Sequence, residues 1–475
     1  MTTAIMMSLV MVVALFLSAC RNQETAAPPP ARPDPAAVAL EQRLSNPAPD
    51  GVAANIWDEA KRFYTARTNT LAWISAEDAH RGADALAMVE AAREHGLDPA
   101  KYQVDALAHQ LASRSATEPA SDRDARNADL DARITALLLT YGHDIALGVT
   151  TPTRVSSLWK SQHTAPDFIG ALQRASSGEV STFTTSVQPP HAQYAALVAY
   201  TRSLLDAQAK GERRAGGSTI DERLRQVALN LERWRWMPDT FGPRYVLVNI
   251  PALHLYVQDG DHTVRDMNVI VGKADGHETP VFSGQMSTVV FSPWWNIPYG
   301  IGQNETAISA GNNPAYLTDH KIDVYRNGKL QNEGEINWFD PKDLKGLTFR
   351  QAPGATNALG RVKFLFPNQF DVYLHDTPDD SPFGEALRAL SHGCVRVADP
   401  EGLAQYVLRD DPAWTPAKIA QAMSSGRERH VKLTTPLPVH LVYFTAWAKD
   451  NGSVEFLPDI YGYDTRQARI KTPTR

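Results

Sequence analysis

The segment from Asp371 to Val397 holds the residues best suited to chemistry. His375 ends one apolar stretch, and Ser391-His392-Gly393-Cys394 leads into another after a loop and a short predicted helix. If the two stretches are neighbouring strands, His375 comes within hydrogen-bond reach of Cys394. An imidazole beside a thiol lowers the pKa of the thiol, accepts its proton and returns it to a leaving group. The pattern predicts acyl transfer, with Cys394 as nucleophile and His375 as proton acceptor and donor.

The residues around Cys394 suit the same chemistry. Gly393 permits a tight turn, so the N–H groups of Gly393 and Cys394 are candidates for an oxyanion hole. Arg396 lies two positions after Cys394 on the same strand face, where a guanidinium can hold a substrate carboxylate. We place Ser391 and His392 with Arg396 in the predicted substrate-binding region. For His392 we expect mainly the role of a hydrogen-bonding scaffold residue.

Taken singly, each of these residues has an ordinary alternative. A strand-end His is commonly structural, a lone Cys is commonly a small core residue, and an Arg is commonly a surface charge. A zinc site built from His375, His392 and Cys394 lacks an evident fourth ligand. Their joint order within one short segment favours catalysis. We expect neither a metal nor an organic cofactor.

The second of the two cysteines, Cys20, lies at the end of an apolar N-terminal run. Two cysteines are too few for a disulfide framework. The run is too short to span a bilayer, and it is typical of a signal peptide over residues 1–19. Leu17-Ser18-Ala19-Cys20 resembles a lipoprotein lipobox, although no Lys or Arg precedes the run. That resemblance implies acylation of Cys20 and a membrane anchor. Because Arg21 rather than Asp follows, it implies the outer membrane, facing the periplasm.

Composition and hydrophobic periodicity divide the rest of the chain. With 475 residues, 43% hydrophobic, the chain suffices for two or three domains, and a net charge of −6 argues against nucleic-acid binding. Residues 20–50 are rich in Pro and Ala and predict a tether. Residues 51–236 predict a helical domain, with a capping box at Ser75–Asp78, helices over Ala79–His95, Leu130–Leu147 and Asp221–Trp236, and a linker over Lys210–Ser218.

After Pro238 the period of the apolar residues changes from 3.6 to 2. This change predicts a multidomain chain, in which the α-helical domain is followed by a β-rich α+β domain over 237–445 and a C-terminal extension over 446–475. Thr415-Pro416 predicts a helix start. The strand pattern breaks in the polar stretch 298–350, which predicts an inserted lid subdomain. Trp294 and Trp295 precede it, either as its hinge or as core aromatics.

The catalytic segment resembles the signature of the L,D-transpeptidases, in which a strand-end His precedes an S/T-H-G-C motif. The segments VNIPALHLYV, PWWNIP, RQAPGATNALGRVKFLFPN, NLERWRWMP and DIYGYD are similar to the large periplasmic subfamily with a helical scaffold domain. In the NALG segment we expect Asn357, Leu359 and Gly360 to form a structural turn. No segment resembles the small peptidoglycan-binding module that large members usually carry, which puts glycan binding in doubt.

The resemblance implies two-step acyl transfer on peptidoglycan stem peptides. Cys394 would form a thioester, and the amine of a neighbouring diaminopimelate would resolve it into a 3→3 cross-link. Carbapenem-type β-lactams would then inhibit the protein. Two related alternatives use water or a protein amine as the acceptor. The alternative from another class is a non-catalytic envelope scaffold lipoprotein, which the intact set of His375, Cys394 and Arg396 disfavours.

Overall fold

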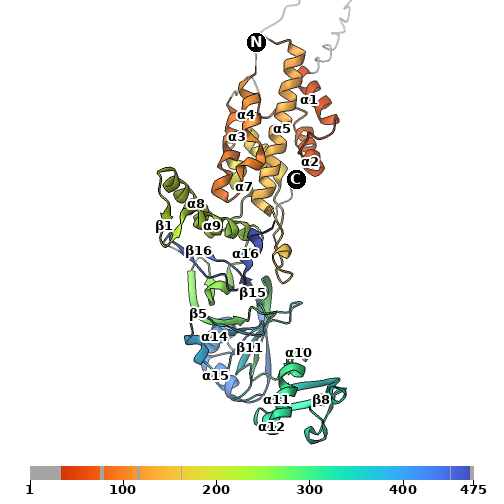
Figure 1. The fold of residues 1–475 in the computed structure, drawn as a ribbon, viewed down its shortest axis with the longest axis vertical. Coiled ribbons are helices and arrows are strands. Elements are labelled where there is room, and N and C mark those ends of the chain that lie inside the picture. The colour runs from red at the N-terminus through yellow and green to blue at the C-terminus, as the bar shows by residue number, and fades with distance from the viewer. Residues whose placement is uncertain are drawn as a thin grey trace, which may run out of the picture.

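The computed structural model describes residues 34–74, 80–114, 118–161, 163–260, 262–449 and 451–470. The predicted signal peptide, Cys20 and the capping box at Ser75–Asp78 lie outside these ranges. The molecule is elongated (Figure 1): a helical domain occupies one end, a β-rich domain the middle, and a small mixed subdomain the other end. This order confirms the predicted fold class of a helical domain followed by a β-rich domain.

The helical domain packs around one long central helix, α5. Its helices are α1 (Pro35–Ser45), α2 (Ala54–Ala66), α3 (Arg81–Glu90), α4 (Val104–Ala112), α5 (Ala120–Leu147), α6 (Phe168–Ser177) and α7 (Thr182–Val187). One face of α5 carries the buried Asp131. Its carboxylate accepts hydrogen bonds from the backbone N–H groups of Ala72, Trp73 and Ile74. A single acidic side chain thereby fixes the segment after α2 against α5.

The tether prediction for residues 20–50 is wrong where α1 forms. Asp34 caps this helix, because its side chain accepts from the Ala36 N–H, and Pro35 occupies the first turn, where a missing N–H costs nothing. Leu40 and Leu44 are buried, and Arg43 pairs with Asp129 of α5 at 2.5 Å. The Pro and Ala content that predicts a tether is therefore compatible with a short docked helix.

Helices α8 (Ala192–Ala209) and α9 (Ile220–Trp234) join the two domains. Between them lies a hairpin of β1 (Arg214–Ala215) and β2 (Ser218–Thr219), where the sequence predicts only a linker. A capping box of Thr219 and Glu222 starts α9. The Arg235 guanidinium, just after α9, donates to the carbonyl of Ile145 in α5 and to the carbonyl of His95. Its side chain is 1% exposed and ties α9 to the helical domain.

The β-rich domain is a closed barrel with flanking helices. Its sheet has the order β13-β5-β14-β12-β11-β6-β15-β3-β4, and β4 also pairs with β5. The strands are β3 (Arg244–Asn249), β4 (His254–Asp259), β5 (His262–Gly272), β6 (Phe282–Phe291), β11 (Val362–Leu365), β12 (Leu374–His375), β13 (Ala389–Ser391), β14 (Val395–Val397) and β15 (Arg429–Val442). Helices α14 (Pro400–Val407) and α15 (Pro416–Ser424) flank it, the latter capped by Thr415 as predicted.

Alternation along the strands separates the interior of the barrel from its outer surface. Inward residues form one buried cluster that includes Val246, Leu255, Val269, Leu374 and Val395. Their sequence neighbours therefore point outward, because successive side chains of a strand face opposite ways. The candidate catalytic residues His375, Cys394 and Arg396 belong to this outer face of the barrel.

The stretch 298–350 folds as a compact subdomain with its own core. Its sheet has the order β7-β10-β8-β9. The prediction of a stretch without strong strands is wrong here, because short strands pair across long sequence distances. The elements are β7 (Trp295–Ile297), α10 (Tyr299–Ile301), η5 (Gly302–Thr306), α11 (Ala307–Asn312), α12 (Tyr316–Asp319), β8 (Ile322–Arg326), β9 (Lys329–Leu330), α13 (Pro341–Leu344) and β10 (Leu347–Gln351).

The described part of the predicted C-terminal extension belongs to the β-rich domain. It contains β16 (Ala446–Ala448), β17 (Val454–Phe456) and α16 (Tyr463–Ala468). Tyr461 and Tyr463 are buried in the barrel cluster. The boundary drawn after residue 445 therefore cuts through a continuous packed unit.

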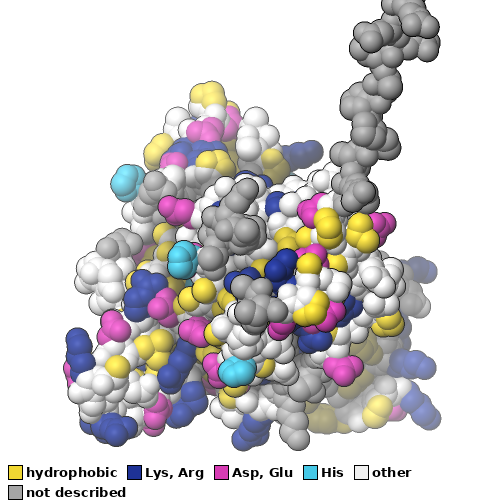
Figure 2. Space-filling model, turned by 90° about the horizontal axis from the view of Figure 1, so that it is seen from above, with side chains coloured by type: hydrophobic (Ala, Val, Ile, Leu, Met, Phe, Trp, Pro, Cys, Tyr) yellow, Lys and Arg dark blue, Asp and Glu magenta, His cyan; other side chains and the backbone are white. Residues whose placement is uncertain are grey.

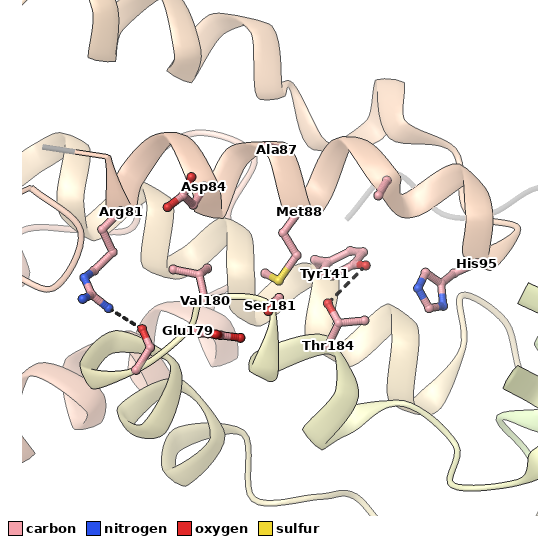
Figure 3. A pocket seen from close by; sticks show the side chains of 12 residues that line it. Arg81, Asp84, Ala87, Met88, His95, Tyr141, Glu179, Val180, Ser181 and Thr184 are labelled. Atoms are coloured by element: carbon pink, nitrogen blue, oxygen red, sulfur yellow. Dashed lines mark hydrogen bonds between the residues drawn. The ribbon is translucent and has the colours of Figure 1, made fainter. Parts of the chain in front are cut away.

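Two views show the surface of the helical end. Seen from that end, basic and acidic side chains are interspersed (Figure 2). A hollow of about 650 Å³ lies beside α3 and α7, where Arg81 donates to the carbonyl of Gly178 and Thr184 to the hydroxyl of Tyr141 (Figure 3). The Arg81 guanidinium and the hydroxyls of Thr184 and Tyr141, which line this hollow, are thus already hydrogen-bonded within the fold. No helix among the described residues has the length and apolar character needed to cross a membrane.

Candidate active site

The site is built on two neighbouring parallel strands, β12 and β14. Their register pairs Leu374 with Val395 and His375 with Arg396. Since Leu374 and Val395 point into the barrel core, His375 and Arg396 point outward together with Cys394. The structure thus brings the predicted nucleophile, base and arginine to one outer face of the barrel.

His375 is held in the tautomer that a general base requires. Its Nδ1 lies 2.6 Å from the carbonyl oxygen of Asp376, so Nδ1 carries the proton and donates it, and Nε2 keeps a free lone pair. The Asp376 carboxylate accepts from the N–H groups of Arg361 and Thr377 and fixes that carbonyl in place. Burial, followed by the Arg396 charge, lowers the pKa of His375 to about 3. The imidazole is therefore neutral at neutral pH.

Cys394 is a protonated thiol at rest, so the predicted lowering of its pKa by the imidazole is wrong for the free protein. Burial raises the pKa of Cys394, and this outweighs the opposing effects of hydrogen bonds with Tyr373 and of the Arg396 charge. The Cys394 Sγ lies 4.0 Å from the carbonyl oxygen of Asp371. Among the hydrogen bonds of the described residues, none joins Cys394 to His375, although their strands are neighbours. A neutral thiol and a neutral imidazole call for proton transfer during attack rather than a preformed ion pair.

The turn before Cys394 is fixed by Ser391. Gly393 has φ +112°, a backbone conformation that favours glycine. Its N–H donates to Ser391 Oγ at 3.1 Å, and Ser391 Oγ donates to the Cys394 carbonyl at 2.5 Å. The Gly393 N–H is therefore not free for an oxyanion, and the prediction that it contributes to an oxyanion hole is wrong. Ser391 is hydrogen-bonded within the loop rather than presented to substrate. Within the described ranges, the Cys394 N–H has no acceptor.

Three residues distant in sequence support this turn from behind. Thr279 Oγ1 donates to the Gly393 carbonyl at 2.9 Å and accepts from the Gly272 N–H. The Tyr461 hydroxyl donates to the Gly272 carbonyl at 2.7 Å and accepts from the Thr279 N–H. A Cβ at Gly272 would lie 1.8 Å from the His277 carbonyl oxygen, so only glycine permits this close packing.

Three cationic side chains gather at the site: Arg396, Lys363 and Arg350, called the site cluster below. Lys363 pairs with His375 across β11 and β12, and its Nζ donates to the Trp294 carbonyl at 3.3 Å. The Arg350 guanidinium lies over the Trp294 ring at 4.3 Å. The Nε atoms of Arg396 and Arg350 are buried and have no hydrogen-bond partner. Burial lowers the pKa of Lys363 and of Arg396.

The inserted subdomain contacts the catalytic motif through His392. The Nε2 of His392 lies 2.6 Å from Glu305 Oε1 of η5, and its ring meets that of His277 at 4.7 Å. This pairing agrees with a hydrogen-bonding role for His392. Trp294 and Trp295 are half-buried at the base of the subdomain, so neither is a fully buried core aromatic.

The NALG turn is structural, as predicted. Asn357 is 0% exposed. Its side-chain amide donates to the carbonyls of Pro293 and Ala352, and its oxygen accepts from the Leu359 N–H. Gly360 closes the turn with φ +60°. This turn leads into β11 and so positions Lys363.

Sequence reasoning missed Lys363, Tyr373 and Thr279. A signal was present for the first two, because Lys363 alternates with Val362 and Phe364, and Tyr373 precedes His375 by two positions on the same face. Thr279 and Tyr461 reach the turn only through tertiary packing, so no local pattern points to them.

Two family models match the chain. The L,D-transpeptidase catalytic domain (YkuD) matches residues 243–419, and the Scaffold domain matches residues 58–200. A Haemophilus influenzae protein named "Putative L,D-transpeptidase" is 36% identical over 241 residues, which are 50% of this chain and 48% of the relative. The chain thus aligns with about half the length of this curated relative.

Two solved structures match parts of the chain. L,D-transpeptidase 1 of Mycobacterium tuberculosis is 14% identical, with 42% of this chain and 61% of that chain covered and a TM-score of 0.17. Bd1075 of Bdellovibrio bacteriovorus is 14% identical, with 48% and 55% covered and a TM-score of 0.16. At these scores neither structure bears on the argument. Residues 243–419 are thus similar to the L,D-transpeptidase catalytic domain, and residues 58–200, which precede them, are similar to the Scaffold domain.

Proposed function

We propose that the protein cross-links peptidoglycan stem peptides by acyl transfer through a Cys394 thioester, giving 3→3 cross-links. The carrying observation is that a neutral His375, whose Nδ1–H is held by the Asp376 carbonyl, lies opposite Arg396 on the strand that Cys394 precedes. A neutral thiol transfers its proton to a neutral imidazole only as the sulfur attacks, which matches a nucleophile that works on a bound acyl group.

In the proposed first step, Cys394 sulfur attacks the carbonyl carbon of the third stem residue, a diaminopimelate, while His375 Nε2 takes the thiol proton. The Cys394 N–H is available to the resulting oxyanion. The C–N bond to D-Ala then breaks, and His375 returns the proton to the leaving amine. In the second step, the side-chain amine of a neighbouring diaminopimelate attacks the thioester and gives its proton to His375, which returns it to the departing sulfur.

The site cluster supports a substrate rich in carboxylates. A tetrapeptide stem presents one carboxylate on the D-Ala terminus and another on the diaminopimelate side chain. Arg396, Lys363 and Arg350 provide half-buried positive charge, and the buried Nε atoms of Arg396 and Arg350 have no hydrogen-bond partner. An unpartnered buried guanidinium donor is costly unless a ligand satisfies it.

The test uses purified protein, disaccharide-tetrapeptide fragments and mass spectrometry of the products. We expect dimers joined 3→3 and free D-Ala, none of them with Cys394→Ala. We also expect one covalent carbapenem adduct per chain, absent in Cys394→Ala. Tripeptide products without dimers would replace the amine acceptor with water. A protein without products or adducts would be the non-catalytic scaffold of the alternative reading.

We further propose that residues 298–350 form a lid that keeps water from the thioester. Support comes from the contact between Glu305 and His392, two residues before the nucleophile, and from the long inserted segment itself. Replacing the subdomain with a short Gly/Ser linker should raise hydrolysis relative to cross-linking while acylation persists. An unchanged ratio in a folded deletion variant would disprove the lid.

The proposed location is the periplasmic face of the outer membrane, with Cys20 lipidated. The supporting observation is the lipobox resemblance at Leu17 to Cys20. Cys20→Ala should move the protein from the membrane fraction to the soluble fraction, with Cys394→Ala as the matched control that stays with the membrane. Membrane association that is unchanged in Cys20→Ala would contradict the anchor.

A further inference from the structure

A second cavity lies on another part of the outer barrel surface, away from the catalytic strands. It has a volume of about 610 Å³ and lies between the outer faces of β3, β4 and β5 and the β16–β17 hairpin. Val246, Leu255 and Met267 of these strands point into the barrel, so their neighbours line the cavity. We call it the outer groove, defined by Tyr245, His254, Tyr256, Gln258, Asp266 and Trp447.

The outer groove presents aromatic rings that the fold does not fully bury. The rings of Tyr256 and Trp447 lie nearly parallel, with centroids 6.1 Å apart and planes 13° apart. Both side chains are half-buried, whereas the surrounding aromatics Trp234 and Phe444 are buried in the cluster behind them. Partly exposed aromatic faces provide flat apolar area at low entropic cost. Such faces match the C–H faces of sugar rings.

The polar groups of the outer groove include Asp266, Glu455 and Lys449, so the groove carries no excess of positive charge. His254 Nε2 lies 2.7 Å from Asp266 Oδ2, and the Gln258 amide donates to Thr263 Oγ1 at 2.6 Å. Lys449 pairs with Glu455 on the hairpin. Donors and acceptors thus occur together without net positive charge, in contrast with the site cluster. This rim suits hydroxyl and acetamido groups rather than carboxylates or phosphates.

We propose that the outer groove binds the glycan strand of peptidoglycan, a chain of N-acetylated hexosamine rings. This inference rests on the proposed function, which brings a glycan-attached stem to Cys394. The outward face of β5 links the two places, since it runs from Asp266 in the groove to Gly272 behind the catalytic turn. Six strand residues at about 3.3 Å each make this roughly 20 Å. A glycan strand bound in the groove would raise the effective concentration of its stem peptides at the Cys394 thiol.

The experiment measures binding of the full chain to glycan strands from which an amidase has removed all stem peptides. We expect saturable binding, weakened about tenfold or more in Tyr256→Ala and in Trp447→Ala, as for other central aromatic anchors. Trp447→Phe should retain most binding. Because Trp447 also packs on Trp234 and Phe444, Gln258→Ala is a further variant that leaves the aromatic packing intact, and it too should bind more weakly. Unaltered thermal melting is the folding control.

A second readout separates this proposal from the proposed function. The groove variants should react with a carbapenem and with soluble tetrapeptide fragments at wild-type rates, yet cross-link polymeric peptidoglycan several-fold more slowly. Wild-type protein that fails to bind stripped glycan, or folded variants that bind it as wild type does, would overturn the groove assignment while carbapenem acylation still supports the catalytic site. Loss of acylation in wild-type protein would instead reject the proposed function.

Discussion

Two clusters of positive charge in the described part of the chain differ in how completely their donors are hydrogen-bonded. The junction cluster consists of Arg233, Arg235 and Glu232, at the end of α9. Arg235 donates to two carbonyls, to Glu232 Oε2 at 2.9 Å and to the Tyr194 hydroxyl. Arg233 reaches Gln467, the Tyr443 carbonyl and Asp464. In the site cluster, by contrast, the Nε atoms of Arg396 and Arg350 have no partner.

The difference separates charges that hold the fold from charges that await a ligand. Each junction arginine spans elements far apart in the sequence. The donors of Arg235 are hydrogen-bonded within the chain, and the Arg233 Nη2, which lacks a hydrogen bond of good geometry, lies 2.6 Å from an Asp464 carboxylate oxygen. A buried ion pair of this kind is costly to break, although it adds little stability over an apolar replacement. In the site cluster the Nε atoms of Arg396 and Arg350 lack hydrogen-bond acceptors, and a substrate carboxylate can supply one. Four predictions test this contrast.

The largest effect should follow from His375→Ala. Removing a member of a catalytic unit typically lowers the rate by a factor on the order of 10³ or more. His392→Ala should keep a larger share of activity, because His392 bonds to Glu305 rather than to the thiol. Both variants should be compared at equal folded fraction, judged by melting, in a carbapenem acylation assay. A dead His392 variant beside an active His375 variant would reverse the two roles.

Arg235→Met should affect stability rather than chemistry. It leaves Glu232 buried without its cation, at a cost of about 3–5 kcal/mol, so the melting temperature should fall clearly. The double variant Arg235→Met with Glu232→Gln should recover part of the loss. Among molecules that stay folded, the acylation rate should match wild type. A single variant as stable as wild type would contradict the structural role of the junction cluster.

Arg396→Gln should show the opposite pattern. Since Arg396 Nε has no partner in the free protein, melting should change little, while the loss of a charge-assisted bond to substrate should cost about 1.5–3 kcal/mol, roughly a 10- to 100-fold loss in kcat/KM. Lys363→Gln is the matched variant on β11, which β12 separates from β14. A strongly destabilised Arg396→Gln protein with normal activity would erase the contrast between the clusters.

The smallest effect concerns pH. Because burial raises the pKa of Cys394, only a small thiolate fraction exists at pH 7, and that fraction grows about tenfold per pH unit below the thiol pKa. Alkylation by iodoacetamide should therefore accelerate from pH 6 to pH 9 without a plateau. His375 stays neutral over this range, since its pKa is about 3. A plateau already present at pH 6 would mean a preformed thiolate–imidazolium pair.

Local patterns explain how much of this molecule could be predicted from its sequence. The change of period near Pro238, the cap at Thr415 and the strand–loop–strand arrangement from His375 to Cys394 are all recorded in neighbouring residues. The helix at Pro35–Ser45 was missed because Pro and Ala content describes both a tether and a capped helix. The strands of the inserted subdomain were missed because each is short and stable only in its sheet.

The details of the site depend on tertiary contacts in the same way. The Gly393 N–H donates to Ser391 Oγ because of the direction in which the Ser391 side chain points, and no sequence motif specifies that direction. The raised pKa of Cys394 reflects burial around the thiol, whereas the sequence shows only that a His is near. The types and order of the residues therefore predict which side chains form the candidate site. Tertiary packing determines whether those side chains are protonated.

The hydrogen bonds from Tyr461 to the back of the catalytic turn have a consequence for the order of synthesis. A ribosome delivers Cys394 well before Tyr461, so the nucleophile emerges before the residue that braces Gly272 and Thr279 behind it. Domains fold from the N-terminus as they are made, and the helical domain can therefore fold while the barrel still lacks its last support. A partial chain that ends before Tyr461 carries the motif in its sequence without the braced turn. The braced turn behind Cys394 therefore forms only once the segment that carries Tyr461 has joined the barrel.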